Sequence, residues 1–256
     1  MAGFSSVDRS LDPAALVSFL DYAAWGEAGM KHYALAAHAL REPDGPILDV
    51  GCGAGHDLAL FAAHGLRAVG VDPSAVMVAA ARTRTVRWGT RVVRAAGEGL
   101  PFGRDAFAGA RVERVLMHVD DPIAVLTETL RCVRPGGLVT AFETDWTRLT
   151  VASAVLPAGA AWLSGVKHPE AGAHLWGLLE DTGCDVHDRV EELSVWRSLA
   201  RLERAVGFPE AVDRAVAAGR VDGDRAARWV TEQRAREATG SFRATVPKVQ
   251  LIATKR

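Results

Sequence analysis

The sequence has few cysteines and no surplus of charge of either sign. Its 256 residues contain three cysteines, Cys52, Cys132 and Cys184, which are far apart and odd in number. This pattern excludes a disulfide framework and a paired-cysteine metal site, so we predict a reducing compartment and no bound metal. Thirty basic and 31 acidic residues leave a net charge of −1. Overall charge therefore favours neither nucleic acid nor an anionic membrane as a partner.

Long apolar runs are also missing. The N-terminal stretch has acidic residues within its first dozen positions and no apolar block long enough for a signal peptide or a membrane span. We therefore expect a soluble, cytoplasmic protein with no membrane partner.

Apolar strand patterns alternate with helical patterns from residue 47 to residue 143. The strand patterns are ILDV (47–50), RAVGVD (67–72), TRVVRAA (90–96), AGARVERVLM (108–117) and LVTAFE (138–143). Helical spacing of apolar residues fills the stretches between several of them, and it also covers residues 10–41 before the first strand. Such alternation predicts parallel βαβ units in a doubly wound α/β sheet, with ligands bound at the carboxyl ends of the strands.

The rhythm changes after residue 143, and it suggests four segments. We expect an N-terminal helical cap at 1–42, a nucleotide-binding core at 43–143, and a lid or substrate segment at 144–183 that contains a helix near 172–181. The last segment, 184–256, holds two strands with a helical insert at 199–239.

The turn after the first strand carries three glycines in the pattern D-x-G-x-G-x-G, from Asp49 to Gly55. A nicotinamide dinucleotide fold requires a third glycine where this chain has His56, so the dehydrogenase interpretation is weakened. Asp72 ends the second strand, where a carboxylate accepts hydrogen bonds from both hydroxyls of a ribose. A tight turn without a ligand is the alternative.

Five motifs occur in a fixed order: LDVGCGAG (48–55), VGVDPS (69–74) with Met77, GEGLPF (97–102), ERVLMHVDDP (113–122) and RCVRPGG (131–137). With these motifs the stretch from about 40 to 143 resembles a class I S-adenosylmethionine-dependent methyltransferase. LWGLLEDTGC (175–184) and KVQLIATKR (248–256) resemble the same family's sixth and seventh strands. The resemblance implies a Rossmann-like, seven-stranded, mostly parallel sheet with an antiparallel last strand, plus helical cap and lid segments.

The resemblance also implies S-adenosylmethionine as the methyl donor, with S-adenosylhomocysteine as product. It implies these cofactor-binding residues: Asp49, Gly51, Gly53, Gly55, Asp72, Pro73, Met77, Gly97, Glu98 and Val115. Asp49 lies near the methionine amino group in such enzymes, the three glycines surround the methionyl portion, and Pro73 and Met77 pack on adenine. The chain departs from the family at Ala96 and Ala108, where many members carry aspartate, which puts the adenine contacts in doubt.

Two residues are candidates for a general base in the methyl transfer. His118 follows the fourth strand at the sheet's carboxyl edge, and a neutral histidine suits either proton transfer or a structural role in the loop. Asp145, after the fifth strand, is a candidate base or orienter of the acceptor; its alternative roles are a helix cap or a solvated acid of the loop.

Aromatic and acidic residues near the same edge are candidates for contact with the acceptor. They are Tyr22, Trp25, Tyr33, Glu143 and Trp146. We expect the three aromatics of the N-terminal segment to lie over the cofactor and acceptor, with plain core packing as the alternative.

These features predict methylation of a small molecule at oxygen, nitrogen or carbon, of the kind found in bacterial secondary metabolism and antibiotic biosynthesis, by a monomer or homodimer. RNA or protein methylation is a rival, although the loop HVDDP lacks the N-P-P-Y-like pattern of enzymes that methylate base amines. A cofactor-dependent cyclase or pericyclase and a cofactor-binding module without turnover also stay open.

Overall fold

The computed structural model describes residues 4–10, 12–41, 43–156, 160–208 and 210–256, with only the backbone described at 4–6, 25 and 161. Eight strands form one sheet in the order β3-β2-β1-β4-β5-β8-β6, and β7 pairs with the other edge of β8. The strands are β1 Ile47–Val50, β2 Ala68–Asp72, β3 Arg91–Arg94, β4 Phe107–Glu113, β5 Val133–Thr144, β6 Thr150–Val151, β7 Cys184–Trp196 and β8 Ala244–Lys255.

The sheet is parallel from β3 to β5 and antiparallel at β8. In register, Asp49 lies opposite Gly70 of β2 and Arg111 of β4. Thr144, at the carboxyl end of β5, lies opposite Lys248 of β8. This arrangement confirms the mostly parallel Rossmann-like sheet with an antiparallel last strand. The sheet has one strand more than the seven expected, β6, whose two residues are too few to give a periodic signal in the sequence.

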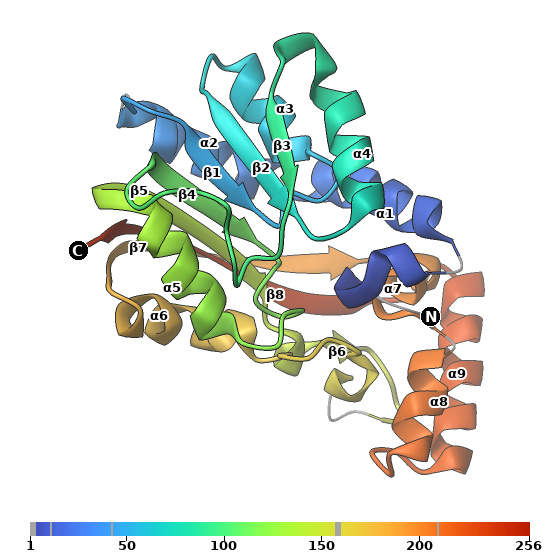
Figure 1. The fold of residues 1–256 in the computed structure, drawn as a ribbon. Helices are drawn as coiled ribbons and strands as arrows, with labels where there is room; N and C mark the ends of the chain where they lie inside the picture. Colours follow the sequence, from blue (N-terminus) through green and yellow to red (C-terminus); the bar gives the residue numbers. More distant parts are fainter. Residues whose placement is uncertain (1–3, 11, 42, 157–159, 209) are drawn as a thin grey trace.

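Helices cover both faces of the sheet (Figure 1). Helices α2, α3 and α4 lie on one face, and α5 and α6 on the other. Their bounds are α2 Ala28–Leu40, α3 His56–Ala63, α4 Ala75–Thr85, α5 Pro122–Cys132 and α6 Ala171–Asp181. Local capping explains where they begin. Asp121 accepts from the backbone N–H of Ala124 at the start of α5, and Ser74 accepts from Met77 at the start of α4.

The N-terminal helical stretch is divided into three elements. A 3-10 helix, η1 (Phe4–Arg9), precedes α1 (Pro13–Gly26), and Glu27 separates α1 from α2. Asp12 caps α1 by accepting from Ala15. The sequence pattern predicts one helical stretch over 10–41, and the interruption at Glu27 turns the chain so that α1 lies across the carboxyl edge of the sheet.

The insert before the last strand forms three helices that project beyond the sheet at the end opposite the C-terminus (Figure 1). They are α7 Leu199–Val206, α8 Glu210–Ala217 and α9 Gly223–Ala238. Gly207 ends α7 in a left-handed conformation with φ +70°. The ring of Trp229 in α9 packs against Trp162 and Phe208, at centroid distances of 5.1 and 6.4 Å.

The three cysteines are buried and unpaired. Within the described ranges no helix is both long and apolar enough to cross a membrane.

Candidate active site

A cavity of about 610 Å³ lies at the carboxyl edge of the sheet. Its lining comes from the turns that follow β1, β2 and β4, from helix α1, and from the ends of β7 and β8 that extend past the other strands. The volume is within the range of small-molecule sites in proteins.

The glycine turn after β1 forms one wall, and each glycine adopts a positive φ. Gly51 has φ +68°, and a Cβ added there would lie 2.3 Å from Cγ2 of Val115. Gly55 has φ +79°, and its added Cβ would lie 2.9 Å from Ala81 of helix α4. Gly51 and Gly53 line the cavity, whereas Gly55 does not. The first two glycines therefore expose backbone to the cavity, and the third lets α4 pack closely.

Two buried carboxylates face the cavity from the ends of β1 and β2. Asp49 has an oxygen, Oδ2, without a hydrogen-bond partner, and burial raises the pKa of this carboxyl well above its usual value. Asp72 accepts from the backbone N–H groups of Gly53 at 3.0 Å and Ser74 at 2.9 Å. Burial nevertheless raises the pKa of Asp72 to about 6. Among the described residues neither carboxyl forms a direct ion pair, although Arg111 and Lys31 act on Asp49 from a longer distance. Each carboxyl is therefore suited to a ligand that supplies hydrogen-bond donors or positive charge.

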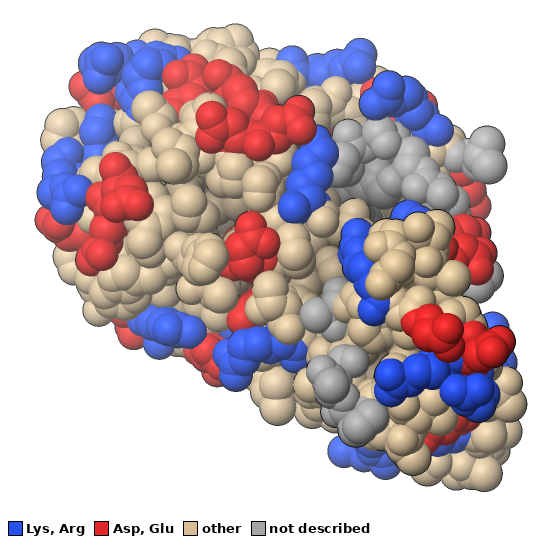
Figure 2. All heavy atoms as spheres, turned by 90° about the horizontal axis from the view of Figure 1, so that it is seen from below, with Lys and Arg blue, Asp and Glu red and all other residues tan. Residues whose placement is uncertain are grey.

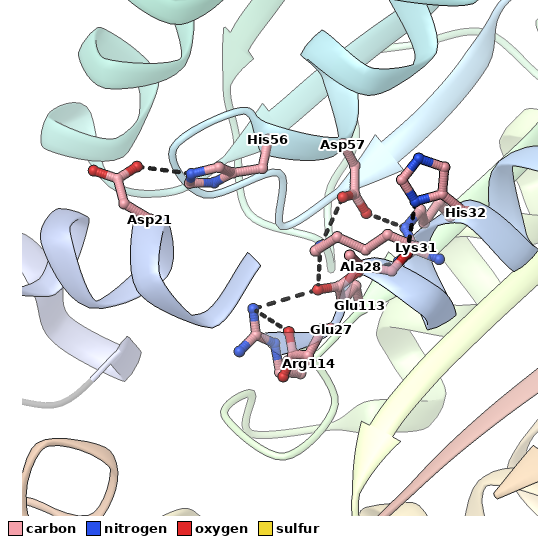
Figure 3. A network of polar contacts seen from close by, with 10 residues as sticks. Asp21, Glu27, Ala28, Lys31, His32, His56, Asp57, Glu113 and Arg114 are labelled. Carbon is pink, nitrogen blue, oxygen red and sulfur yellow. Dashed lines mark hydrogen bonds and ion pairs between the residues drawn. The ribbon is translucent and has the colours of Figure 1, made fainter. Parts of the chain in front are cut away.

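A second group of charges closes the cavity on the side of α2 (Figure 3). Lys31 lies 2.7 Å from Asp57 and 2.6 Å from Glu113. Arg114 lies 3.3 Å from both Glu113 and Glu27. Two residues outside the labels of the figure complete the cluster: Arg111 pairs with Asp57 and Glu113, and Lys248 lies 2.9 Å from Glu27. We call these seven residues the buried charge cluster.

At the end of the cavity away from β2, which we call the acceptor chamber, apolar side chains lie beside polar ones. The apolar side chains are Tyr22, Met117, Trp146, Leu193, Val195, Trp196 and Val246, and the polar ones include Thr144, Glu192, Ser194 and Lys248. The rings of Trp146 and Trp196 meet at a centroid distance of 6.2 Å, and the Trp146 indole N–H donates to Met117 Sδ at 3.2 Å. Large apolar side chains are exposed here, since Leu193 is 56% and Val195 48% accessible.

His118 lines the cavity on the loop after β4. Its backbone N–H donates to Val115 at 2.9 Å, which tightens the loop. Burial lowers the pKa of the imidazole to about 4, and the positive charges of Arg114 and Lys167 act in the same direction. The ring is therefore neutral near pH 7.

Comparison with known proteins identifies the family. Residues 48–141 match the model of a methyltransferase domain. An uncharacterized 37.1 kDa protein in transposon TN4556 of Streptomyces fradiae is 32% identical over 247 residues, which cover 93% of this chain and 70% of that protein. An uncharacterized methyltransferase of Mycobacterium leprae is 40% identical over 100 residues, 39% of this chain and 37% of that one. The chain belongs to the class I S-adenosylmethionine-dependent methyltransferases.

Solved structures share the fold of this methyltransferase at low identity. The YcgJ protein of Bacillus subtilis superposes with a TM-score of 0.61 at 15% identity, over 88% of this chain and 99% of that one. The [4+2]-cyclase SpnF gives 0.54 at 23% identity, over 88% and 80%. A geranyl diphosphate methyltransferase, solved with GPP and sinefungin, gives 0.53 at 18% identity, over 90% and 79%.

The buried polar atoms at the carboxyl edge of the sheet are suited to bind the methyl donor. The unpartnered oxygen of Asp49 fits an ammonium group such as that of the methionyl tail. Pro73, Met77, Gly97, Glu98 and Val115 line the cavity beside Asp72. A Cβ on Gly97 would lie 3.0 Å from Val125, so the bare backbone at that position keeps the loop close to α5.

Besides Gly55, three predicted residues lie outside the cavity of the methyltransferase, and each has another partner. Asp145 is buried and caps the 3-10 helix η3 (Trp146–Arg148), where it accepts from the backbone N–H of Thr147 at 3.1 Å. Tyr33, on α2, donates its hydroxyl to Asp188 of β7. These positions correct the expectation that Asp145 and Tyr33 face the acceptor.

Glu143 is the third. It is fully buried, and its carboxylate accepts from the backbone N–H of Leu116 at 2.6 Å and from those of Val115 and Met117. Burial raises the pKa of this carboxyl to about 8. Glu143 thus holds the loop that carries His118 and does not line the cavity. Of the aromatic candidates, Tyr22 and Trp146 line the cavity, while the Trp25 side chain lies outside the described residues.

The buried charge cluster escaped prediction from the sequence. A signal exists in RVE (111–113), where a strand that alternates with apolar residues places Arg111 and Glu113 on one face. Lys248 and Gln250 likewise occupy alternate positions of an otherwise apolar strand. Within the described part of the chain, no group of three or more His, Cys, Asp or Glu side chains is arranged to hold a metal ion.

Proposed function

We propose that this methyltransferase methylates a small molecule with a large apolar surface, and that His118 is the general base. The observation that carries the proposal is the continuity of the cavity. One space joins the carboxylates Asp49 and Asp72, which suit the donor, to the acceptor chamber and its apolar side chains. An acceptor held in the chamber would reach the methyl group from the side of β4 and β5.

The bound donor supplies a methyl group that is already electrophilic, so the protein's task is to align the acceptor and exclude water. Asp72 binds the ribose hydroxyls and Asp49 the ammonium group. The glycine turn brings backbone against the methionyl chain. His118 accepts a proton from the acceptor where the acceptor is protonated.

A nucleic-acid acceptor is less well supported. The arginines of residues 82–94 form the basic cluster of the sequence, and the structure gives each a local partner. Arg82 donates to Val92, Arg84 to Ala54, and Arg94 to Pro73, while Arg87 and Arg91 lie over Trp88 and Phe102. On the face in Figure 2, acidic and basic groups are interspersed. We also propose that the enzyme is cytoplasmic and acts in secondary metabolism, because the sequence resembles methyltransferases of that kind and lacks long apolar runs.

The test is release of S-adenosylhomocysteine when the protein and the methyl donor are incubated with pools of small aromatic and terpenoid acceptors. Release that depends on the acceptor supports the proposal. Binding of the donor without release from any pool contradicts it and favours cyclisation or a regulatory role.

A further inference from the structure

Lys248 is a buried lysine in the wall of the acceptor chamber. Only 6% of the residue is accessible, yet it lines the cavity from β8. In the sheet it lies opposite Thr144 on β5 and Glu192 on β7, and both also line the cavity. Lysine is rarely buried without a partner, because removing an ammonium group from water is costly.

The partners present leave Lys248 with unused donors. Among the described residues, Glu27 is the one carboxylate within ion-pair distance of its Nζ, at 2.9 Å. An ammonium group has three N–H donors. Glu27 is also shared, since its other oxygen lies 3.3 Å from Arg114. One carboxylate therefore serves two cations.

The whole buried charge cluster has the same imbalance. It joins four cations, Lys31, Arg111, Arg114 and Lys248, to three carboxylates, Glu27, Asp57 and Glu113. The buried carboxyl groups of Asp49 and Glu143 also act on these cations, Asp49 on Lys31 and Arg111 and Glu143 on Arg114. Among the described ion pairs Lys248 has Glu27 alone, so an anion bound beside Lys248 would be its second partner.

The position of Lys248 favours the acceptor over the donor as the source of that anion. In the strand order, β8 is three strands from β1, and neighbouring strands lie about 4.8 Å apart, so Lys248 is on the order of 14 Å from the glycine turn. Lys31 and Arg114 are nearer to that turn and suit the donor's own carboxylate better. Val246, two residues from Lys248 on the same face of β8, is one of the apolar side chains of the acceptor chamber.

We infer that Lys248 binds an anionic oxygen of the acceptor, so that the substrates are apolar molecules carrying an ionised phenol, enol or carboxylate. The inference rests on the proposed function, because it assigns a role within the same cavity. Glu27 pairs with the ammonium group, Thr144 is the neighbour of Lys248 on β5, and the rings of Trp146 and Trp196 contact the apolar body of the molecule.

The experiment measures the binding of three similar para-substituted nitrobenzenes to the full chain, which is first saturated with S-adenosylhomocysteine. They are para-nitrophenol above its pKa, para-nitrobenzoate, and the neutral para-nitroanisole. Calorimetry should show that the wild type binds one or both anions more tightly than the neutral analogue, and the preferred anion identifies phenolate or carboxylate as the better mimic. Equal affinity for all three, or no binding of either anion, overturns the inference without use of any variant.

The variants then assign the preference to Lys248. Lys248→Met should weaken binding of the preferred anion about tenfold or more, and leave the neutral analogue unchanged. Lys248→Arg should retain much of the preference. Lys255→Met is the matched control, since Lys255 is on the same strand but pairs with Asp105 outside the cavity.

Binding of S-adenosylhomocysteine alone separates the possible failures. Unchanged affinity in Lys248→Met supports a site for the acceptor, whereas a loss as large as that for the anions assigns Lys248 to the donor's carboxylate and contradicts the inference. Failure of the wild type to bind S-adenosylhomocysteine is a failure of the proposed function instead.

Discussion

At the scale of single residues, Asp72 is the side chain whose replacement has the clearest expected effect. Its carboxylate orders the turn through Gly53 and Ser74 and retains lone pairs for two ribose hydroxyls. Asp72→Ala should weaken S-adenosylmethionine binding by roughly 1.5–3 kcal/mol for each charged hydrogen bond lost. Calorimetry on the folded variant measures this, with the exposed Asp44→Ala as control. Wild-type affinity in Asp72→Ala would refute the assignment of the ribose site.

His118 belongs to the same scale, and its role is tested by the pH dependence of turnover. His118→Ala should lower turnover by a factor on the order of 100 or more and leave donor affinity nearly intact. Because the pKa of His118 is lowered to about 4, the acid limb of the wild-type profile should lie near pH 4 and not near the usual histidine pKa. Equal activity of variant and wild type across the pH range would return His118 to a structural role.

His38 gives a prediction about stability. It is buried between Phe61 and Thr140, and burial lowers its pKa from 6.5 to about 3. The unfolded chain therefore binds an additional proton between about pH 6.5 and 3, so this group removes stability as pH falls through that window, by up to about 1.4 kcal/mol per pH unit.

The comparison with His38→Gln isolates that contribution. Glutamine keeps a hydrogen-bonding group near Thr140 but does not titrate. The difference in free energy of unfolding between wild type and variant, from urea titrations at pH 7 and pH 5, should shift in favour of the variant at the lower pH. A difference that is independent of pH would contradict a neutral buried His38.

The position of a residue relative to the strand patterns predicts that it lies at the carboxyl edge of the sheet, but it does not predict where its side chain points. The motifs locate Asp49, Asp72 and His118 at this edge, since Asp49 lies near the end of β1, Asp72 ends β2 and His118 is on the loop after β4. Glu143 lies near the end of β5 and Asp145 directly follows that strand, but the Glu143 carboxyl turns under the loop after β4 and Asp145 caps η3. Their directions depend on β8 and on the backbone of residues far along the chain, which local sequence does not encode.

At the scale of elements, the N-terminal segment is tied to the donor site by charged side chains. Asp8 accepts from the backbone N–H of Ala75 at 2.9 Å at the start of α4, and Asp21 binds His56 at 2.7 Å. Asp21 is about half exposed, so its contribution to docking is small. These contacts, with the ion pair of Asp21 and Arg84, hold α1 over the cavity through partly exposed side chains, and we expect them to break at low cost.

We therefore predict that the segment closes over the ligand. Hydrogen exchange of residues 10–35 should slow when S-adenosylhomocysteine is added, because Leu20 lies near Gly53 and Tyr22 lines the cavity. The amides of β1 serve as an internal control, since they are buried in the sheet with or without ligand. Complete protection of residues 10–35 in the ligand-free protein would show that the segment is fixed core.

The βα rhythm was predictable because apolar periodicity decides those elements. Boundaries that depend on single residues were harder. The turn at Glu27 lies between Gly26 and Gly29, but the helical spacing of apolar residues continues on both sides of it. The Glu27 carboxylate is held by Lys248 and Arg114 from other parts of the fold. The breaks at Gly207 and Asp222 within 199–239 are local signals, since Gly207 ends α7 and Asp222 caps α9.

At the scale of the whole molecule, the fold separates two tasks along one edge of the sheet. The strands up to β4 carry the residues that suit the donor, and β5, β7 and β8 with their extended ends carry the acceptor chamber. The family explains the first half, which the motifs predicted. The second half is built by the antiparallel strands and the helical insert, which lie outside the matched methyltransferase domain at residues 48–141.

A crystal structure of the protein grown with S-adenosylhomocysteine tests this division. The structure described here predicts the ribose hydroxyls within hydrogen-bond distance of Asp72, the ammonium group at Asp49, and the sulfur atom directed past His118 into the chamber lined by Trp146. S-adenosylhomocysteine bound outside the cavity, or inside it with the sulfur directed away from His118 and Trp146, would contradict it.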